Sequence, residues 1–243
     1  MLIKDDIFFK YGDTHTKYKK APTKKHKSCG WRSYIRSRIH GGNEVKEHSI
    51  PWQVGLVASL NAYPICGGMI ISKHVILTAA HCVDIEIINE KGGIFSWYIA
   101  AKEHDFTDRD KADYHKICKV LVHDKWDREA NAYDFALLFL KTEITFDKKA
   151  EKLCLPTPKL FPSNSLVGKQ LRVSGWGQVN ATSASVHGLR DAEVYAISNE
   201  KCKKKYHGKK EIRDWHLCAG DRNGNNEDFV KNKDSCHGDS GGK

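Results

Sequence analysis

Short apolar runs divided by turn-forming residues characterise the chain from Pro51 onward. These runs are rich in β-branched and aromatic side chains and cover residues 52–60, 69–77, 119–123, 135–140 and 171–175. Runs of about 5–8 residues with this composition are typical of strands rather than helices. The pattern therefore predicts an all-β barrel or sandwich, and residues 156–168 are a candidate crossover between two barrels.

Residues 1–38 lack this periodicity and carry most of the positive charge. They hold eleven Lys or Arg and three Asp, so they contribute +8 to a net charge of +10, and the rest of the chain is close to neutral. A basic segment of this kind is usually solvated and irregular, and it can also bind a polyanion such as a glycosaminoglycan or a nucleic acid. We therefore expect a separate leader, with a polyanion as its candidate partner.

Eight cysteines lie far apart in the sequence. None belongs to a close CxxC pair of the kind that binds zinc, and most of the thirteen histidines stand singly in polar surroundings, so we expect no catalytic metal. Widely spaced cysteines favour disulfides and an extracellular location. No apolar run has the length of a signal peptide at the N-terminus or of a membrane span elsewhere. Either the signal peptide is not present in this chain or the protein stays inside the cell, and the cysteines favour the first. We therefore expect a secreted protein with no membrane span.

A serine between glycines, Ser240, stands in the segment DSCHGDSGG at residues 234–242. Glycines allow a tight turn that exposes the hydroxyl and leaves backbone N–H groups able to bind an oxyanion. The segment also matches the G-x-S-x-G elbow of α/β-hydrolases, but that fold needs its Asp and His after the serine, and only three residues follow. The order His, Asp, Ser is the alternative arrangement.

His81 and Asp134 supply that order. His81 lies in the segment TAAHC, where an apolar run ends, and Asp134 begins the segment DFALLFL, at the start of a buried strand. A carboxylate at such a position is costly to bury without a partner, and the Nδ1–H group of a histidine is a suitable partner. The three residues therefore predict a hydrolytic site with a serine nucleophile.

These segments resemble the His, Asp and Ser motifs of the chymotrypsin/trypsin family of serine proteases. In addition, RIHGG at residues 38–42 resembles the family's activation junction, CGG at 66–68 its first cysteine strand and SGWG at 174–177 the start of its second barrel. The resemblance implies two six-stranded antiparallel β-barrels, the second incomplete in this chain. It divides the chain into an activation segment (1–38), a first barrel (39–155) and a second barrel (156–243).

The resemblance also implies a role for each site residue. Ser240 would be the nucleophile, His81 the general base and then acid, and Asp134 the group that fixes the tautomer of His81. Gly238 and Ser240 would donate their backbone N–H groups to the oxyanion. Asp234 would form the floor of the substrate-binding pocket and select Lys or Arg before the cleaved bond. The expected function is that of a trypsin-like endopeptidase acting on protein substrates.

Activation by another protease is implied at Arg38. Cleavage there would free the α-amine of Ile39, which in the family pairs with the residue at the position of Asp239. Breaking a buried pair of this kind from one side costs about 3–5 kcal/mol, enough to switch an oxyanion hole between disordered and formed. We therefore expect a zymogen that an activating protease converts.

Disulfides can be assigned from the same resemblance. Cys118 matches no family position, and the partner of Cys236 would lie beyond Lys243. The implied pairs are Cys29–Cys154, Cys66–Cys82 and Cys202–Cys218.

Two further sites are expectations of the sequence. Asn180 begins the only glycosylation sequon, which matters if the protein is secreted. Glu103, Asp110 and Asp113 match by spacing the acidic positions of a calcium loop found in some relatives, and oxygen ligands suit Ca²⁺. We expect no cofactor, and calcium is only a candidate.

Two functions stay open at this stage. Further strands follow the serine motif in the family, so the chain ending at Lys243 is expected to be an incomplete protease. The first interpretation is an active endopeptidase of which this chain is a part. The alternative is a truncated, catalytically inactive binding or decoy protein derived from a protease. The complete set of His81, Asp134 and Ser240 argues for the first.

Overall fold

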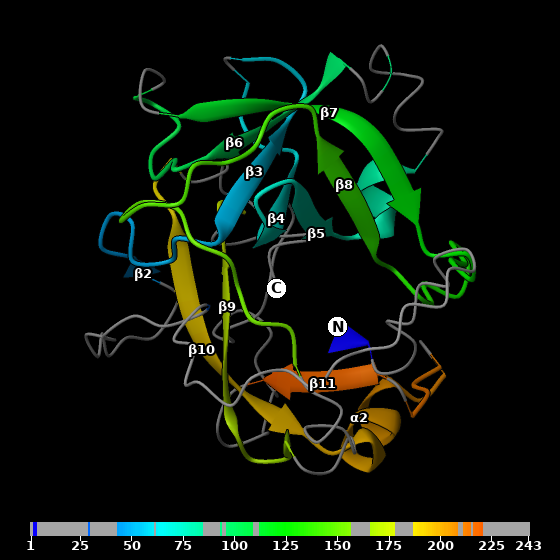
Figure 1. The fold of residues 1–243 in the computed structure, drawn as a ribbon. Helices are drawn as coiled ribbons and strands as arrows, with labels where there is room; N and C mark the ends of the chain where they lie inside the picture. Colours follow the sequence, from blue (N-terminus) through cyan, green and yellow to red (C-terminus); the bar gives the residue numbers. More distant parts are fainter. Residues whose placement is uncertain are drawn as a thin grey trace, which may run out of the picture.

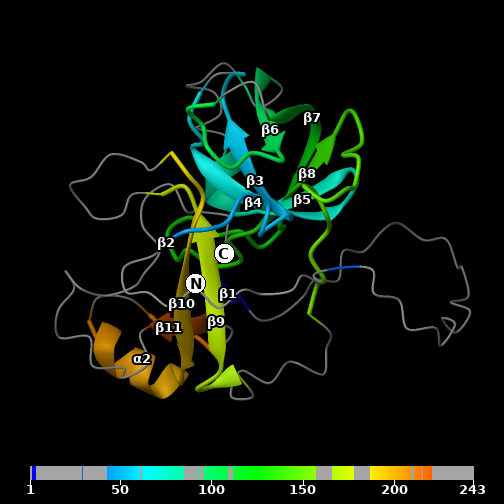
Figure 2. The same ribbon diagram turned by 90° about the vertical axis from the view of Figure 1, so that its left-hand side faces the viewer.

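The structure is a computed structural model that describes part of the chain. The described residues are 2–3, 29, 43–60, 62–84, 93, 96–108, 112–156, 166–177, 187–208, 211–214 and 216–220. They form a closed β-barrel and a second, open sheet (Figure 1). Figure 2, turned by 90°, shows the barrel stacked above the second sheet. The all-β fold expected from the apolar runs is confirmed.

Six antiparallel strands close the barrel in the order β3-β4-β5-β8-β7-β6. Residue Thr78, at the end of β5, lies opposite Ala136, at the start of β8. The residues that follow Thr78 and those that precede Ala136 therefore leave the barrel at the same end. The strand bounds are Gln53–Val57 for β3, Cys66–Ser72 for β4, Val75–Thr78 for β5, Tyr98–Ala101 for β6, Asp113–Val122 for β7 and Ala136–Leu140 for β8.

Apolar side chains that alternate along the strands fill the barrel. Along β8, buried residues alternate with partly buried ones, and Leu138 at its centre has no exposed surface. Ile70, Ile76 and Trp97 are equally inaccessible. A Cβ atom on Gly68 would lie 2.7 Å from Cγ2 of Ile76, so glycine is needed for β4 and β5 to pack at this distance. This packing fixes the ends of β5 and β8 relative to each other.

The second sheet is built around β10 (Arg190–Ile197), which pairs with β9 (Gln170–Gly175). The sheet has the order β1-β11-β10-β2, with β9 also on β10. Arg172 on β9 forms ion pairs with Asp191 and Glu193 on β10. The remaining strands are β1 (Leu2–Ile3), β2 (Asn43–Glu44) and β11 (His216–Gly220). In the described residues this sheet stays open.

Polar and aromatic contacts join the barrel to the second sheet. Ser174 Oγ on β9 donates to Oε1 of Gln53 on β3 at 2.8 Å, and Gln53 is buried. Trp176 Nε1 donates to the carbonyl oxygen of His104 at 3.0 Å, and its indole packs edge-on against Phe106 with ring centroids 5.1 Å apart. The two parts therefore share a small apolar core of their own.

The expected strands match the structure where the apolar pattern was strong. Residues 69–77 form two strands instead of one run, because a turn at residues 73–74 separates β4 from β5. The pattern did not predict β6, β10, β11 or the helix α2 (Asn199–Tyr206). In α2 only Cys202 is buried, so the helix has no apolar stripe to reveal it. Its N-terminus is capped by Ser198, whose side chain accepts from the backbone N–H of Lys201.

One strand lies in the leader that was expected to be irregular. Leu2–Ile3 forms β1, which pairs antiparallel with β11, with Leu2 opposite Leu217. A two-residue strand on a sheet edge pairs through its backbone N–H and C=O groups. It therefore has no side-chain periodicity from which it could be predicted. The expectation was wrong for these two residues.

We expect the barrel core to dominate stability. Leu138→Ala should lower the free energy of unfolding by about 2–5 kcal/mol, because it leaves a cavity in a close-packed interior. The matched control is Leu60→Ala, since Leu60 is 45% exposed, and its effect should stay within about 0.5 kcal/mol. Urea unfolding of both variants measures the difference. Equal effects would contradict this description of the core.

Candidate active site

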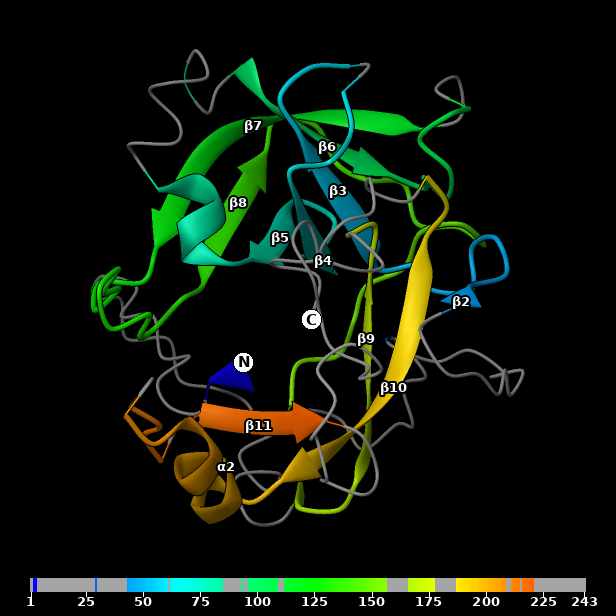
Figure 3. The same ribbon diagram turned by 180° about the vertical axis from the view of Figure 1, so that it is seen from behind.

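His81 sits on a short 3-10 helix directly after β5. This helix, η1 (Ala80–Val83), lies beside β8 and β7 (Figure 3). At the end of β5, the hydroxyl of Thr78 donates to the carbonyl oxygen of Gly67 on β4 at 2.8 Å. This buried hydrogen bond holds the strand end from which η1 begins. Thr78 begins the segment TAAHC, but the sequence predicts no role for its hydroxyl, three positions before His81.

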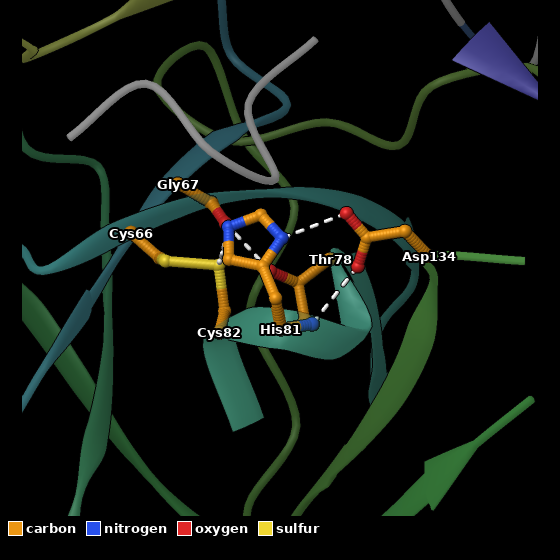
Figure 4. The surroundings of a disulfide bond; sticks show 6 residues. All are labelled: Cys66, Gly67, Thr78, His81, Cys82 and Asp134. Carbon is orange, nitrogen blue, oxygen red and sulfur yellow. Dashed lines mark hydrogen bonds and ion pairs between the residues drawn. A yellow bond between two sulfur atoms is a disulfide. The ribbon is translucent and has the colours of Figure 1, made fainter. Parts of the chain in front are cut away.

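A disulfide fixes the other end of this segment. Cys82 on η1 is bonded to Cys66 at the start of β4, with a Cα–Cα distance of 6.1 Å, and both residues are buried (Figure 4). The bridge joins residues 16 apart in the sequence. A disulfide that closes a loop of this length stabilises the folded protein by roughly 3 kcal/mol, because it lowers the entropy of the unfolded chain. His81 is therefore held between a strand end and a covalent crosslink.

Asp134 approaches His81 from the loop before β8. Its Oδ1 accepts the backbone N–H of His81 at 2.9 Å, and its Oδ2 lies 2.7 Å from Nδ1 of the imidazole (Figure 4). A carboxylate can only accept here, so the pair requires a proton on Nδ1 and leaves the lone pair on Nε2. The imidazole is 39% exposed and the Asp134 side chain 20%. The arrangement is therefore a base that faces solvent, oriented by a largely buried acid.

The surroundings of Asp134 keep its carboxylate charged. Burial would raise its pKa, but the hydrogen bonds from the side chain and backbone of His81, together with the charge of the imidazole, outweigh burial and lower the pKa. An ionised Asp134 stabilises the imidazolium that forms when His81 accepts a proton. The pair can therefore act in general acid–base chemistry.

A metal does not fit at this position. Sulfur atoms of Cys66 and Cys82 and a ring nitrogen of His81 lie within 4.8 Å of one another. Metal ligation by cysteine needs the thiolate, whereas these two sulfurs are joined in a disulfide. Nε2 of His81 lies 3.7 Å from Sγ of Cys82, which is a weak acceptor and leaves this nitrogen available as a base.

The expected nucleophile, oxyanion donors, pocket residue and activation residues lie outside the described part of the chain. Of the expected catalytic residues, the structure therefore places His81 and Asp134, and it brings these two together. The residues outside the described ranges are Arg38, Ile39, Asp110, Asn180, Asp234, Gly238, Asp239 and Ser240.

The structure contains the three disulfides that the resemblance implied. Besides Cys66–Cys82, these are Cys29–Cys154, with a Cα–Cα distance of 5.1 Å, and Cys202–Cys218, which links α2 to β11. Cys118 is a free, exposed cysteine whose Sγ lies 3.3 Å from the carbonyl oxygen of Phe139. The Cys29–Cys154 bridge ties residue 29 to the segment that follows β8.

Two of the three candidate calcium ligands, Glu103 and Asp113, lie in the described part of the chain, and each contacts protein groups through at least one carboxylate oxygen. One carboxylate oxygen of Glu103 accepts backbone N–H groups at 2.8 and 3.0 Å. Burial raises the pKa of Glu103, and the nearby acids Asp108 and Asp105 raise it further. Asp113 instead pairs with Lys102 at 3.4 Å and with His115 at 3.2 Å. An ammonium group beside Asp113 does not favour a cation shared with Glu103.

No helix among the described residues combines the length and apolar character that crossing a membrane requires.

We expect Asp134 to make stability depend on pH. Because its folded-state pKa is lowered, its contribution is fully present above the unfolded value of about 4 and is lost as pH falls through the folded value. The difference in unfolding free energy between the unchanged protein and Asp134→Asn should therefore shrink below about pH 4. Urea unfolding across this range measures it, with Asp214→Asn as control, since that side chain is 88% exposed. A difference that grows in acid would refute the assignment.

Comparison with known proteins gives a consistent family. The trypsin family model matches residues 39–242. The clotting factor G beta subunit of Tachypleus tridentatus is 31% identical over 222 residues, which are 89% of this chain and 68% of that protein. Trypsin 5G1 of Aedes aegypti is 36% identical over 214 residues, 87% of this chain and 73% of that protein. The solved structure of neuropsin, a serine protease of mouse brain, has a TM-score of 0.66 at 28% identity and covers 83% of this chain and 79% of its own. The chain belongs to the trypsin family of serine proteases.

Proposed function

We propose that this chain is the zymogen of a secreted, trypsin-like serine endopeptidase that cleaves after Lys or Arg. The observation that carries the proposal is the His81–Asp134 pair, in which both carboxylate oxygens bond to one histidine. The family match that contains this pair extends to residue 242 and so includes Ser240. A solvent-facing base oriented by a buried acid is the arrangement that activates a serine nucleophile.

The proposed reaction proceeds through an acyl-enzyme. Ser240 Oγ attacks the carbonyl carbon of the scissile peptide bond while Nε2 of His81 accepts the hydroxyl proton. The C–N bond then breaks, His81 returns the proton to the leaving amine, and the acyl group stays on Ser240. Water attacks this ester with His81 again as base, which releases the acid and regenerates the serine. Asp134 stays ionised throughout, in keeping with its lowered pKa.

Charge development in the intermediate requires donors near the oxyanion. The backbone N–H groups of Gly238 and Ser240 are the proposed donors, and one oxyanion donor contributes about 3–4 kcal/mol to transition-state stabilisation in a serine protease of another fold. Asp234 is the proposed selector of Lys or Arg, because a buried carboxylate favours a cationic side chain that pairs with it.

Activation is proposed to occur by cleavage after Arg38. The new α-amine of Ile39 would then pair with Asp239 and order the oxyanion hole. The leader would stay attached as a light chain, since Cys29 is bonded to Cys154. Its basic residues are the proposed contact for a polyanion, with eleven Lys or Arg among residues 1–38.

Secretion is supported by the disulfides. Three bridges in a chain of this size are typical of proteins that fold in an oxidising compartment. One relative carries the name of a clotting-factor subunit and another that of a trypsin, and both names fit a protease that acts on other proteins.

Hydrolysis of a small arginyl amide by the full chain, cleaved after Arg38, tests the proposed function. We expect turnover by the unchanged chain and loss by Ser240→Ala of all but a residual rate, because the nucleophile is removed. Asp234→Ser should abolish cleavage after Lys and Arg while some cleavage after apolar residues remains. If the unchanged chain binds substrate without turnover, the protein is the inactive binding or decoy protein instead. A retained Lys/Arg preference in Asp234→Ser would show that the pocket residue is misassigned.

Arg38→Gln should give a protein that trypsin-like activators cannot switch on, because the bond before Ile39 no longer follows a basic residue. The measurement is amidase activity before and after treatment with trypsin, with the unchanged chain as control. Non-reducing gels of the treated control should show the leader still attached through Cys29. Full activity of the uncut chain would contradict the zymogen proposal.

A further inference from the structure

The loop that carries Asp134 has an unusual backbone next to this residue. Tyr133 has a φ of 55° and Asn131 a φ of 47°, both in the left-handed region. The backbone N–H of Phe135 donates to the carbonyl oxygen of Tyr133 at 2.8 Å, which closes a three-residue turn centred on Asp134. Asparagine tolerates the left-handed region, whereas for a bulky residue such as tyrosine it is a genuine outlier. The direction of the Asp134 side chain therefore depends on a conformation that Tyr133 does not favour by itself.

The ring of Tyr133 contacts two residues that follow β7. It stacks on the imidazole of His123 with centroids 5.0 Å apart and an interplanar angle of 6°. The ammonium group of Lys125 lies 5.5 Å from the centroid of the tyrosine ring. Stacked aromatic pairs and cation–π contacts both stabilise the ring in place.

The same imidazole contacts the residue on the other side of Asp134. The ring of Phe135 meets His123 edge-on, with centroids 4.6 Å apart and an interplanar angle of 65°. His123 is buried, with 6% of its surface exposed. Both neighbours of Asp134 in the sequence thus pack against one buried ring.

His123 itself is fixed to the barrel. It follows the last residue of β7, Val122, which lies opposite Ala136 of β8. Its backbone N–H donates to the carbonyl oxygen of Phe135 at 3.2 Å, and its Nδ1 accepts the backbone N–H of Lys125 at 3.1 Å. The ring that supports Tyr133 and Phe135 therefore has a defined position.

We propose that the stacked rings of His123 and Tyr133 hold the Asp134 carboxylate in line with His81, which makes Tyr133 a positioning residue for this pair. The inference rests on the proposed function, because it gives the pair its catalytic meaning. The geometry leaves little tolerance: both oxygens of Asp134 are bonded to His81, at 2.9 and 2.7 Å, so a rotation of the turn breaks at least one of the bonds.

The first test reads the His81–Asp134 hydrogen bond directly. In the full chain, the Nδ1–H proton of His81 should give a low-field proton NMR resonance, since a carboxylate accepts it at 2.7 Å. Tyr133→Phe keeps the ring and should keep the resonance. Tyr133→Leu removes the stack but keeps a bulky residue in the left-handed region, so the resonance should weaken or vanish through exchange with water.

A matched control separates positioning from general loss of stability. Tyr114 packs edge-on against Tyr98 with centroids 6.4 Å apart, on β7 and β6 of the same barrel. Tyr114→Leu should lower the melting temperature, as Tyr133→Leu does, yet leave the His81 resonance unchanged. If the two leucine variants affect the resonance alike, the stack is only structural and the proposal is wrong.

The second test is kinetic and uses the arginyl amide with the full, cleaved chain. Tyr133→Leu should lower kcat by about tenfold to about 100-fold with KM nearly unchanged, because misplacement of the acid acts on the transition state. Tyr133→Phe should restore kcat. A loss confined to KM would overturn the positioning role.

The NMR test does not depend on the proposed function. If the unchanged chain hydrolyses nothing, the proposed function fails, and the NMR comparison still decides whether Tyr133 positions Asp134. If the unchanged chain lacks the low-field resonance, there is no His81–Asp134 bond to position and the inference falls. Unchanged resonance and unchanged kcat in Tyr133→Leu would also refute it and leave the proposed function standing.

Discussion

The pair of hydrogen bonds between His81 and Asp134 is the constraint around which this end of the barrel is organised. It joins residues 53 positions apart in the sequence, and neither side chain is well placed without the other. An isolated buried carboxylate is costly, and an isolated imidazole has no fixed tautomer. The barrel makes the pairing possible because Thr78 of β5 lies opposite Ala136 of β8. The chain therefore leaves β5 and enters β8 at the same end of the barrel.

The two partners are held by different means. His81 is fixed covalently, since Cys82 beside it is bonded to Cys66, and the strand before it ends in a buried hydrogen bond from Thr78. Asp134 has no crosslink and lies in a loop of 13 residues between β7 and β8. Its position depends on packing against His123 and on a three-residue turn. The acid is therefore the partner that is more sensitive to substitutions nearby.

The sequence predicted the barrel and the pairing of His81 with Asp134. It did not predict the packing of Tyr133 on His123 that supports Asp134. Apolar runs reveal strands such as β8, whose alternate residues are buried, and the ordered motifs single out His81 and Asp134. They do not reveal α2, which buries only Cys202, because a polar helix has no apolar stripe. The stack of His123 on Tyr133 joins residues ten apart through a left-handed backbone, and a tyrosine in the sequence does not signal that conformation.

Two acids of the barrel show what marks a candidate catalytic carboxylate. Glu103 is the more deeply buried, with 6% of its surface exposed, and burial together with nearby Asp108 and Asp105 raises its pKa. Asp134 is also desolvated, yet its pKa is lowered because His81 donates two hydrogen bonds to it. For Glu103 burial outweighs the two backbone hydrogen bonds that it accepts, and this favours the neutral acid, which cannot stabilise a cation. A buried acid becomes useful to catalysis when its partner is a base that still reaches solvent, as the imidazole of His81 does with 39% exposure.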